Sequence, residues 1–227
     1  MEQLDHIVGL IALTMGVGWA SGINLYATIL MLGLLNNTGH IALPSELTVV
    51  ADPLVLMAAG FMYCVEFFAD KIPGVDTGWD GLHTFIRIPA GAALASAAVG
   101  DISPAVEVAA ALVGGGLSAA AHATKAGSRV LINTSPEPVS NWTASITEDL
   151  LVLGGLWTAL HQPVVFLAAL AVFIVLVIWL LPRIWRAIKK VFGWLKGKML
   201  RGSAIPSAQT PDGVEKSVKP SAPDSGH

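Results

Sequence analysis

The stretch ADKIPGVDTGWDGLHTFIRIPAG, residues 69–91, gathers charged groups and a histidine between two strongly apolar segments. Asp80, His83 and Arg87 follow one another at intervals of three and four residues, so they share one face of a helix. Glu66 and Asp70 are four residues apart and share a face of the helix before it. The sequence therefore predicts two consecutive helices with charged faces near the connection that joins them.

Composition decides what surrounds these charges. Of the 227 residues, 54% are hydrophobic and only 13% are charged, and the mean hydropathy is +0.66. A soluble domain is about 25% charged. Long apolar runs throughout the chain indicate a multi-pass helical membrane protein. The single cysteine, Cys64, excludes an intramolecular disulfide. The sequence has no soluble domain with a basic patch interleaved with aromatic residues, so it predicts no nucleic-acid partner.

Six apolar segments are long enough to cross a bilayer, at about 4–35, 47–68, 79–99, 104–123, 142–160 and 163–181. The first segment follows an acidic start without the basic region of a signal peptide, so we expect it to stay as a membrane helix. The connections 36–46, 100–103 and 161–162 carry no Lys or Arg, and all 13 such residues fall on the other side. The positive-inside rule then places that side and both termini in the cytoplasm. The predicted fold class is an all-α membrane protein with six transmembrane helices.

The chain after the sixth segment changes character. We interpret 1–182 as the transmembrane domain and 183–201 (RIWRAIKKVFGWLKGKMLR) as a basic amphipathic interfacial helix on anionic lipids. A basic stop-transfer anchor is the alternative for this segment. Residues 202–227 are rich in Pro and Ser and polar, which predicts a disordered cytoplasmic tail.

Two pairs of similar strings share one offset of about 97 residues. LLNNT at Leu34 matches LINTS at Leu131, and ADPLVL at Ala51 matches EDLLVL at Glu148. The two halves, about 1–100 and 101–182, hold three segments each, which predicts inverted repeats of the kind found in secondary transporters. Chance similarity between apolar strings is the alternative.

The first segment of each half is too long for one straight span. As straight helices, residues 4–36 and 104–133 would extend about 50 Å and about 45 Å. Both contain glycine clusters, GVGWASG and GGGLSAAAHATKAG. Broken helices at matching places predict a site at the membrane midplane. The alternative is that these small residues only let helices pack closely.

Several ionisable groups must lie at membrane depth. If the third helix began after Arg87, about 12 residues would remain, roughly 18 Å and too short to cross. Likewise the fifth helix must begin near residue 142, which carries Glu148 and Asp149 about 9 Å inward. Asp52 lies inside the second segment beside Pro53. Such groups are costly in a membrane, so they face an interior path or pair with one another.

The predicted polar pathway therefore contains Asn24, Asp52, Glu66, Asp70, Arg87, His122, Lys125, Glu148 and Asp149. We expect Arg87 and Lys125 to pair with the carboxylates. Structural ion pairs with snorkelling ends are the alternative, and for Asp76 and Asp80 a place in a solvated connection is the favoured interpretation.

Three strings carry a resemblance to a known family: ASGINLYATILMLGLL, FFADKIPGVDTGWDGLHTFIRIPAG and HATKAGSRVLINTSPEPVSNW. Over about 4–181 the chain resembles the uncharacterised bacterial integral membrane proteins of domain of unknown function 4126. The resemblance implies a bacterial inner (cytoplasmic) membrane protein and supplies no activity. Separately, EFFADK is similar to the E-x-G-D-K-T signature of a cation/proton exchanger family, with one extra residue and without its Gly and Thr.

The function that these features predict is a transporter or permeation protein, ion-coupled, for a small solute or ion. A lipid translocator is an alternative, because a phosphate head group suits Arg87, Lys125 and Arg129. A membrane-embedded enzyme is another, with His122, Glu148 and Asp149 as a metal or acid–base site, although the sequence contains no H-E-x-x-H or G-x-S-x-G motif. The last alternative is a scaffold that binds through its basic tail. We expect no enzymatic activity and no cofactor, name the bilayer and anionic lipids as partners, and leave a homo-oligomer open.

Overall fold

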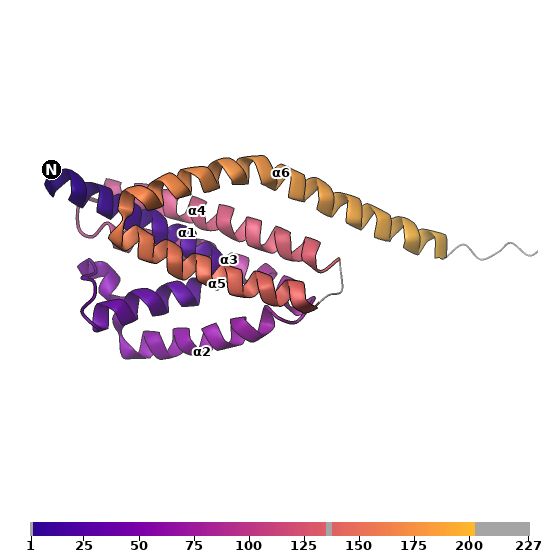
Figure 1. Cartoon of the computed structure of the whole chain (residues 1–227), viewed down its shortest axis with the longest axis horizontal. Coiled ribbons are helices and arrows are strands. Elements are labelled where there is room, and N and C mark those ends of the chain that lie inside the picture. Colours follow the sequence, from indigo (N-terminus) through magenta and orange to yellow (C-terminus); the bar gives the residue numbers. More distant parts are fainter. Residues whose placement is uncertain (1, 135–137, 203–227) are drawn as a thin grey trace, which may run out of the picture. The chain divides into compact units, whose positions relative to one another are not determined.

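A computed structural model describes residues 2–134 and 138–202, and within these ranges every regular element is a helix (Figure 1). The helices are α1 (Glu2–Asn37), η1 (Ser45–Ala51), α2 (Pro53–Ala69), α3 (Val75–Ala98), α4 (Pro104–Ile132), α5 (Pro138–His161) and α6 (Pro163–Gly202). The all-α prediction is confirmed, and each predicted segment coincides with one helix or, for the second, with η1 and α2 together. Residues up to Lys190 form one compact unit.

Several helices are long and apolar enough to cross a membrane. They are α1, α4 and the part of α6 up to Lys190, and η1 with α2 qualifies as a pair bent by 59°. Large apolar side chains also point away from the bundle, among them Phe61, Phe85 and Leu112 with exposed fractions of 69%, 81% and 73%. Soluble proteins rarely expose so many. These features confirm the prediction of a membrane protein.

Local sequence explains where the helices begin. Pro53 and Pro104 each stand at the start of a helix, where the missing N–H of proline costs nothing. The side chains of Asp52 and Ser103 accept hydrogen bonds from the free N–H groups that follow. Helix α6 continues through Pro182 as far as Gly202, so no helix end separates the predicted span from the predicted interfacial segment. The predicted disordered tail lies outside the described residues, apart from Gly202.

Helix α1 breaks at Asn24 and folds back on itself. Asn24 has a non-helical backbone (φ −146°, ψ 98°), and its side-chain Oδ1 accepts a hydrogen bond from the N–H of Ala27 at 3.0 Å, which caps the second half of the helix. Leu13 and Leu32 would lie about 28 Å apart in a straight helix. Instead both belong to one apolar cluster that also contains Ala98, and Figure 1 shows the second half returning to the side of the N-terminus. The predicted break in the first helix is confirmed, and it produces a hairpin.

The other helices run between two ends of the bundle, defined here as the acidic end and the basic end. The acidic end holds Glu2, residues 38–52, 99–104 and 161–163, and the basic end holds residues 70–75, 133–134 and 138. Helices α2, α4 and α6 run towards the basic end, while α3 and α5 return. Because Glu2 and residues 38–52 both lie at the acidic end, α1 begins and ends there. Among the described residues, no Lys or Arg lies at the acidic end.

Small residues allow α1, α3 and α4 to cross in close contact. A Cβ atom added to Gly18 would lie 2.6 Å from the Cα of Gly114, and one added to Gly91 would lie 2.6 Å from the Cβ of Ser118. A Cβ atom added to Gly22 would lie even closer to Ser118, against its backbone oxygen. Helix α4 runs without interruption from Pro104 to Ile132. The prediction of a break in the fourth segment is therefore wrong, because its glycines serve helix packing, the alternative that the sequence left open.

Candidate functional site

Seven charged side chains meet in the interior of the bundle and form what we name the charge network. Its members are Glu66, Asp70, Asp80, Arg87, Lys125, Arg129 and Glu148. They come from α2, its C-terminal cap, α3, α4 and α5. Six of the seven side chains are at most 4% exposed, and Glu148 is 14% exposed. The network thus ties four helices together in a site that is nearly closed to solvent.

Arg87 holds the deepest part of the network. Its Nη2 lies 2.6 Å from Glu66 Oε1, and its Nη1 lies 3.1 Å from Asp80 Oδ1. Nη1 also donates to His122 Nδ1 at 3.2 Å. Because the guanidinium can only donate, His122 accepts through Nδ1 and carries its proton on Nε2, which lies 2.8 Å from the hydroxyl of Thr84. His122 is therefore neutral and lies beside the ion pairs of Arg87.

Lys125 connects the network to the break in α1. Its ammonium lies 2.9 Å from Asp70 Oδ2, 3.2 Å from Glu66 Oε1 and 3.4 Å from Glu148 Oε2. The same ammonium donates to the backbone carbonyl of Ile23 at 3.2 Å. That carbonyl ends the first half of α1, where the helix dipole favours a cation. The charge network and the hairpin thus share one side chain.

Arg129 closes the network towards the basic end. Its Nε and Nη2 hold the two carboxylate oxygens of Glu148 at 3.2 and 2.7 Å, a bidentate arrangement that lysine cannot reproduce. Nη1 donates to the backbone carbonyl of Asp70 at 2.8 Å. Arg129 therefore fixes α5 and the α2–α3 connection to α4.

The network lacks one positive charge. Four carboxylates face three cations, which leaves one formal negative charge if every group is ionised. Three carboxylate oxygens, Glu66 Oε2, Asp70 Oδ1 and Asp80 Oδ2, are buried without a hydrogen-bond partner. Buried polar atoms normally have partners, and an uncompensated buried charge is expensive. One more proton or small cation would therefore make the network electrically neutral.

Asp149 on α5 contacts the break in α1 through Asn24. Its carboxylate accepts hydrogen bonds of 2.9 Å from Asn24 Nδ2 and 2.9 Å from the hydroxyl of Tyr63. It also borders a cavity of about 360 Å³ that follows the returning half of α1 from Ala27 to Leu35. Asn24 therefore stands between a cavity on the acidic-end side and the charge network on the basic-end side.

Most of the chain matches a known protein family. The profile of a family described as "Domain of unknown function (DUF4126)" matches residues 11–183. The chain belongs to this family. The match confirms the resemblance seen in the sequence. No curated protein and no solved structure matches the chain, so no activity is transferred to it from a relative.

The structure brings together eight of the nine predicted pathway residues. Asn24 and Asp149 meet at the break, and the other six, including His122, contact one another in and beside the charge network. Asp52 is the exception, because it is exposed at the acidic end and accepts a hydrogen bond from the N–H of Leu54 at 2.7 Å. A helix cap accounts for this aspartate.

Sequence reasoning gave too little weight to Asp80 and Arg129, which belong to the network, and to Asp76, which lies outside it. Asp80 is fully buried and paired with Arg87, and Asp76 is buried and bonded to Asn133 at 2.7 Å, so neither lies in a solvated connection. The signal for Asp80 was its place on the same helical face as Arg87. Arg129 stands four residues after Lys125, which places both cations on one face of α4.

The connection between α2 and α3 contributes Lys71, which contacts two aromatic side chains. Lys71 donates to the backbone carbonyl of Phe67 at 2.9 Å, lies over the Phe67 ring and is 5.0 Å from the centre of the Trp142 ring. Burial lowers the pKa of Lys71. Burial also raises the pKa of Asp70, although the Lys125 ammonium opposes the change. Within residues 2–134 and 138–202, no group of three His, Cys, Asp or Glu side chains has the geometry to hold a metal ion.

Proposed function

We propose that this protein is a membrane transporter for a small solute or ion, with α2 to α6 crossing the bilayer and α1 entering and leaving on one side. Helices α3 and α5 carry charges, and they also expose Phe85 and Leu150 to the outside. Because no Lys or Arg among the described residues lies at the acidic end, the positive-inside rule favours the basic end as the cytoplasmic side. The hairpin then puts the N-terminus outside and the C-terminus inside, which revises the expectation that both lie in the cytoplasm. The bacterial inner membrane stays a prediction. The inverted-repeat plan assumed three crossing segments in each half, and it does not fit this topology, in which α1 returns to the side where it entered.

One observation carries this proposal: the break at Asn24 joins a cavity to a buried charge network. On one side Asn24 binds Asp149, which borders the cavity along the returning half of α1. On the other side the carbonyl of Ile23 accepts a hydrogen bond from Lys125. Interrupted helices supply free backbone groups and dipole ends for ions and substrates at membrane depth. The hairpin tip is thus the part of the molecule best placed to bind a transported solute.

The missing positive charge supports coupling to a proton or small cation. Asp80 has the weakest cation contacts among the carboxylates, at 3.1 Å from Arg87 and 3.8 Å from Lys125, and its Oδ2 has no partner. We assign the binding of the coupling proton or cation to Asp80. Binding there would neutralise the network, and release would restore the charge that attracts the next ion.

Purified protein in liposomes provides the test. A pH-sensitive dye inside the liposomes and an imposed gradient report flux, screened over metal cations and small metabolites. We expect Asp80→Asn and Asp149→Asn to abolish coupled flux. Asp52→Asn is the matched control, because asparagine also caps a helix and the site is exposed, so it should retain wild-type flux.

The outcomes separate the alternatives. If both buried variants fold and transport like the wild type, the network is structural and the coupling mechanism is wrong. If the wild type moves no solute or ion under any gradient, transport itself is refuted, and lipid translocation or scaffolding becomes the better interpretation.

A further inference from the structure

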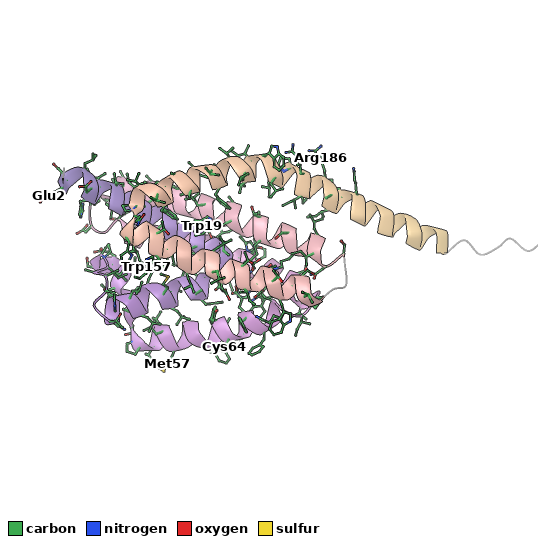
Figure 2. The ribbon with its side chains drawn as sticks, in the orientation of Figure 1. Glu2, Trp19, Met57, Cys64, Trp157 and Arg186 are labelled. Carbon is green, nitrogen blue, oxygen red and sulfur yellow. The ribbon has the colours of Figure 1, made fainter. Side chains whose placement is uncertain are left out.

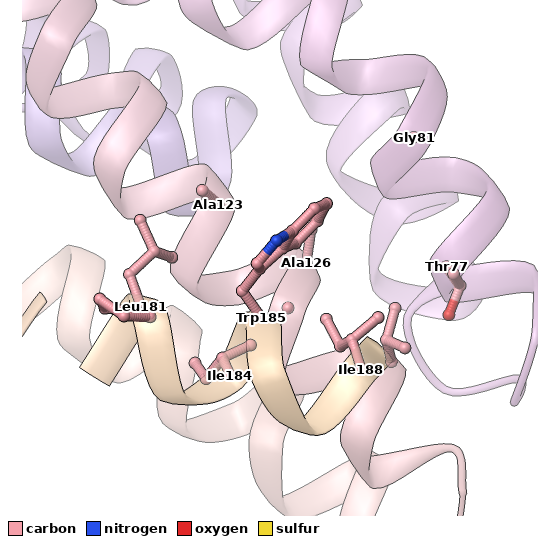
Figure 3. A pocket seen from close by; sticks show the side chains of 11 residues that line it. Thr77, Gly81, Ala123, Ala126, Leu181, Ile184, Trp185 and Ile188 are labelled. Carbon is pink, nitrogen blue, oxygen red and sulfur yellow. The ribbon is translucent and has the colours of Figure 1, made fainter. Parts of the chain in front are cut away.

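A second cavity lies away from the charge network, between α3, α4 and α6 near the basic end (Figure 3). Its volume is about 720 Å³, within the range of about 300–1,000 Å³ typical of ligand sites. The lining residues used here are Gly81, Ala123 and Ala126 on one side and Leu181, Trp185 and Ile188 on the other. None of the residues that line it belongs to the charge network. We name it the α6 groove.

The α6 groove is apolar because small residues on two helices face large ones on the third. Gly81 and Ala126 leave space, while side chains of α6 such as Trp185 and Ile188 cover it (Figure 3). Ile184 fixes the separation of the helices, since a Cβ added to Gly127 would lie 2.7 Å from its Cγ2. Both α4 and this part of α6 qualify as membrane-spanning helices. The molecules that surround such a groove are lipids.

Two cations on α6 lie next to residues that line the groove. Arg186 and Lys189 are exposed, and no acidic residue occurs anywhere in the sequence of α6. The Nε of Arg186 lies 3.2 Å from the carbonyl oxygen of Pro182, and the ammonium of Lys189 lies 5.2 Å from the centre of the Trp185 ring. Pro182 and Trp185 both line the groove. Figure 2 shows Arg186 on the outer side of α6, where a lipid head group could reach it.

We propose that the α6 groove binds an acyl chain of an anionic phospholipid, with the phosphate held by Arg186 and Lys189. The apolar lining suits the chain, and the two cations favour a negatively charged head group over a zwitterionic one. Such a lipid would fill the space beside α6 and stabilise its packing on α3 and α4. This site is independent of the proposed transport pathway.

Native mass spectrometry of the full-length protein tests the proposal, with phosphatidylglycerol or phosphatidylcholine added to detergent micelles. We expect retained phosphatidylglycerol adducts and few phosphatidylcholine adducts. Gly81→Leu should weaken phosphatidylglycerol binding about tenfold, because its side chain takes the place of about two methylene groups. Gly116→Leu is the matched control, since both glycines have open space around an added Cβ and Gly116 lies away from the groove.

Charge removal gives a second measurement. Arg186→Gln and Lys189→Gln should each weaken phosphatidylglycerol binding about fivefold and leave phosphatidylcholine unchanged. Equal adducts on Gly81→Leu and Gly116→Leu would overturn the groove as the binding site. Equal binding of both lipids by the wild type would overturn the role of the cations. A dimer that Gly81→Leu abolishes would show instead that a second copy of the chain occupies the groove.

Discussion

Replacing Arg87 by alanine would remove the guanidinium that contacts both Glu66 and Asp80. These carboxylates lie 2.6 and 3.1 Å from it, and all three side chains are 0% exposed. Lys125 would remain near both carboxylates, at 3.2 and 3.8 Å, but the formal charge of the network would fall from −1 to −2. Breaking a buried pair in this way costs about 3–5 kcal/mol. Because a domain is stable by about 5–15 kcal/mol, the variant should lose between about a fifth and all of its stability.

The measurement is equilibrium unfolding in detergent micelles by titration with a denaturing detergent. Arg183→Ala is the control, since Arg183 is exposed on α6 and should change the free energy of unfolding by less than about 0.5 kcal/mol. Arg87→Lys should recover only part of the loss. A single ammonium cannot reproduce a fork whose two nitrogens bind carboxylates on different helices.

A double-mutant cycle shows whether the cost is electrostatic. Asp80→Asn removes one negative charge from the network. It should therefore raise the free energy of unfolding more in the Arg87→Met background than in the wild type, with a coupling energy of about 0.5–3 kcal/mol. The reasoning fails if Arg87→Ala is no less stable than Arg183→Ala. It also fails if the two changes are additive, because Arg87 would then be stabilised by packing alone.

Two further predictions concern the hairpin. In a cysteine-free background, single cysteines at positions Gln3 and Thr38 should react with an impermeant maleimide added outside whole cells. A cysteine at Thr134 should not react. Labelling at only one of the first two positions would contradict the return of α1. Gly22→Leu should destabilise the protein by about 1–3 kcal/mol through overpacking against α4, whereas Gly9→Leu, at a glycine with open space around it, should not; equal melting temperatures for the two variants would refute the close crossing.

The positions of the helices could be predicted from sequence because their signals are local. Apolar runs of sufficient length place the starts of the predicted segments within about four residues of the start of a helix, although α4 continues to Ile132, past its predicted end at 123. The break in α1 was also predicted, from its length and glycines. Its direction was not, because the return depends on contacts that bring Leu13 and Leu32 into one cluster. Such contacts between distant segments leave no local pattern in a uniformly apolar sequence.

The site could be predicted in outline for a similar reason. Charge at membrane depth is costly wherever it occurs, so Arg87, Lys125 and Glu148 stood out. Asp52 stood out by the same argument and is an exposed helix cap, because its helix begins at Pro53 rather than before it. Asp80 was undervalued because its distance from the apolar core depends on where α3 begins, at Val75.

The cost of the charge network is itself an argument for function. A buried ion network is often no more stable than well-packed apolar residues of the same size, so stability alone gives little reason to keep one. Here the network is also unbalanced, and three of its carboxylate oxygens have no partner. Lys125 of the network donates a hydrogen bond to the carbonyl of Ile23 at the hairpin tip. If a proton or cation binds to the network, the pull of the carboxylates on Lys125 weakens and its bond to that carbonyl changes. Under the proposed function, Lys125 is the side chain that would couple the occupancy of the network to the geometry of the break.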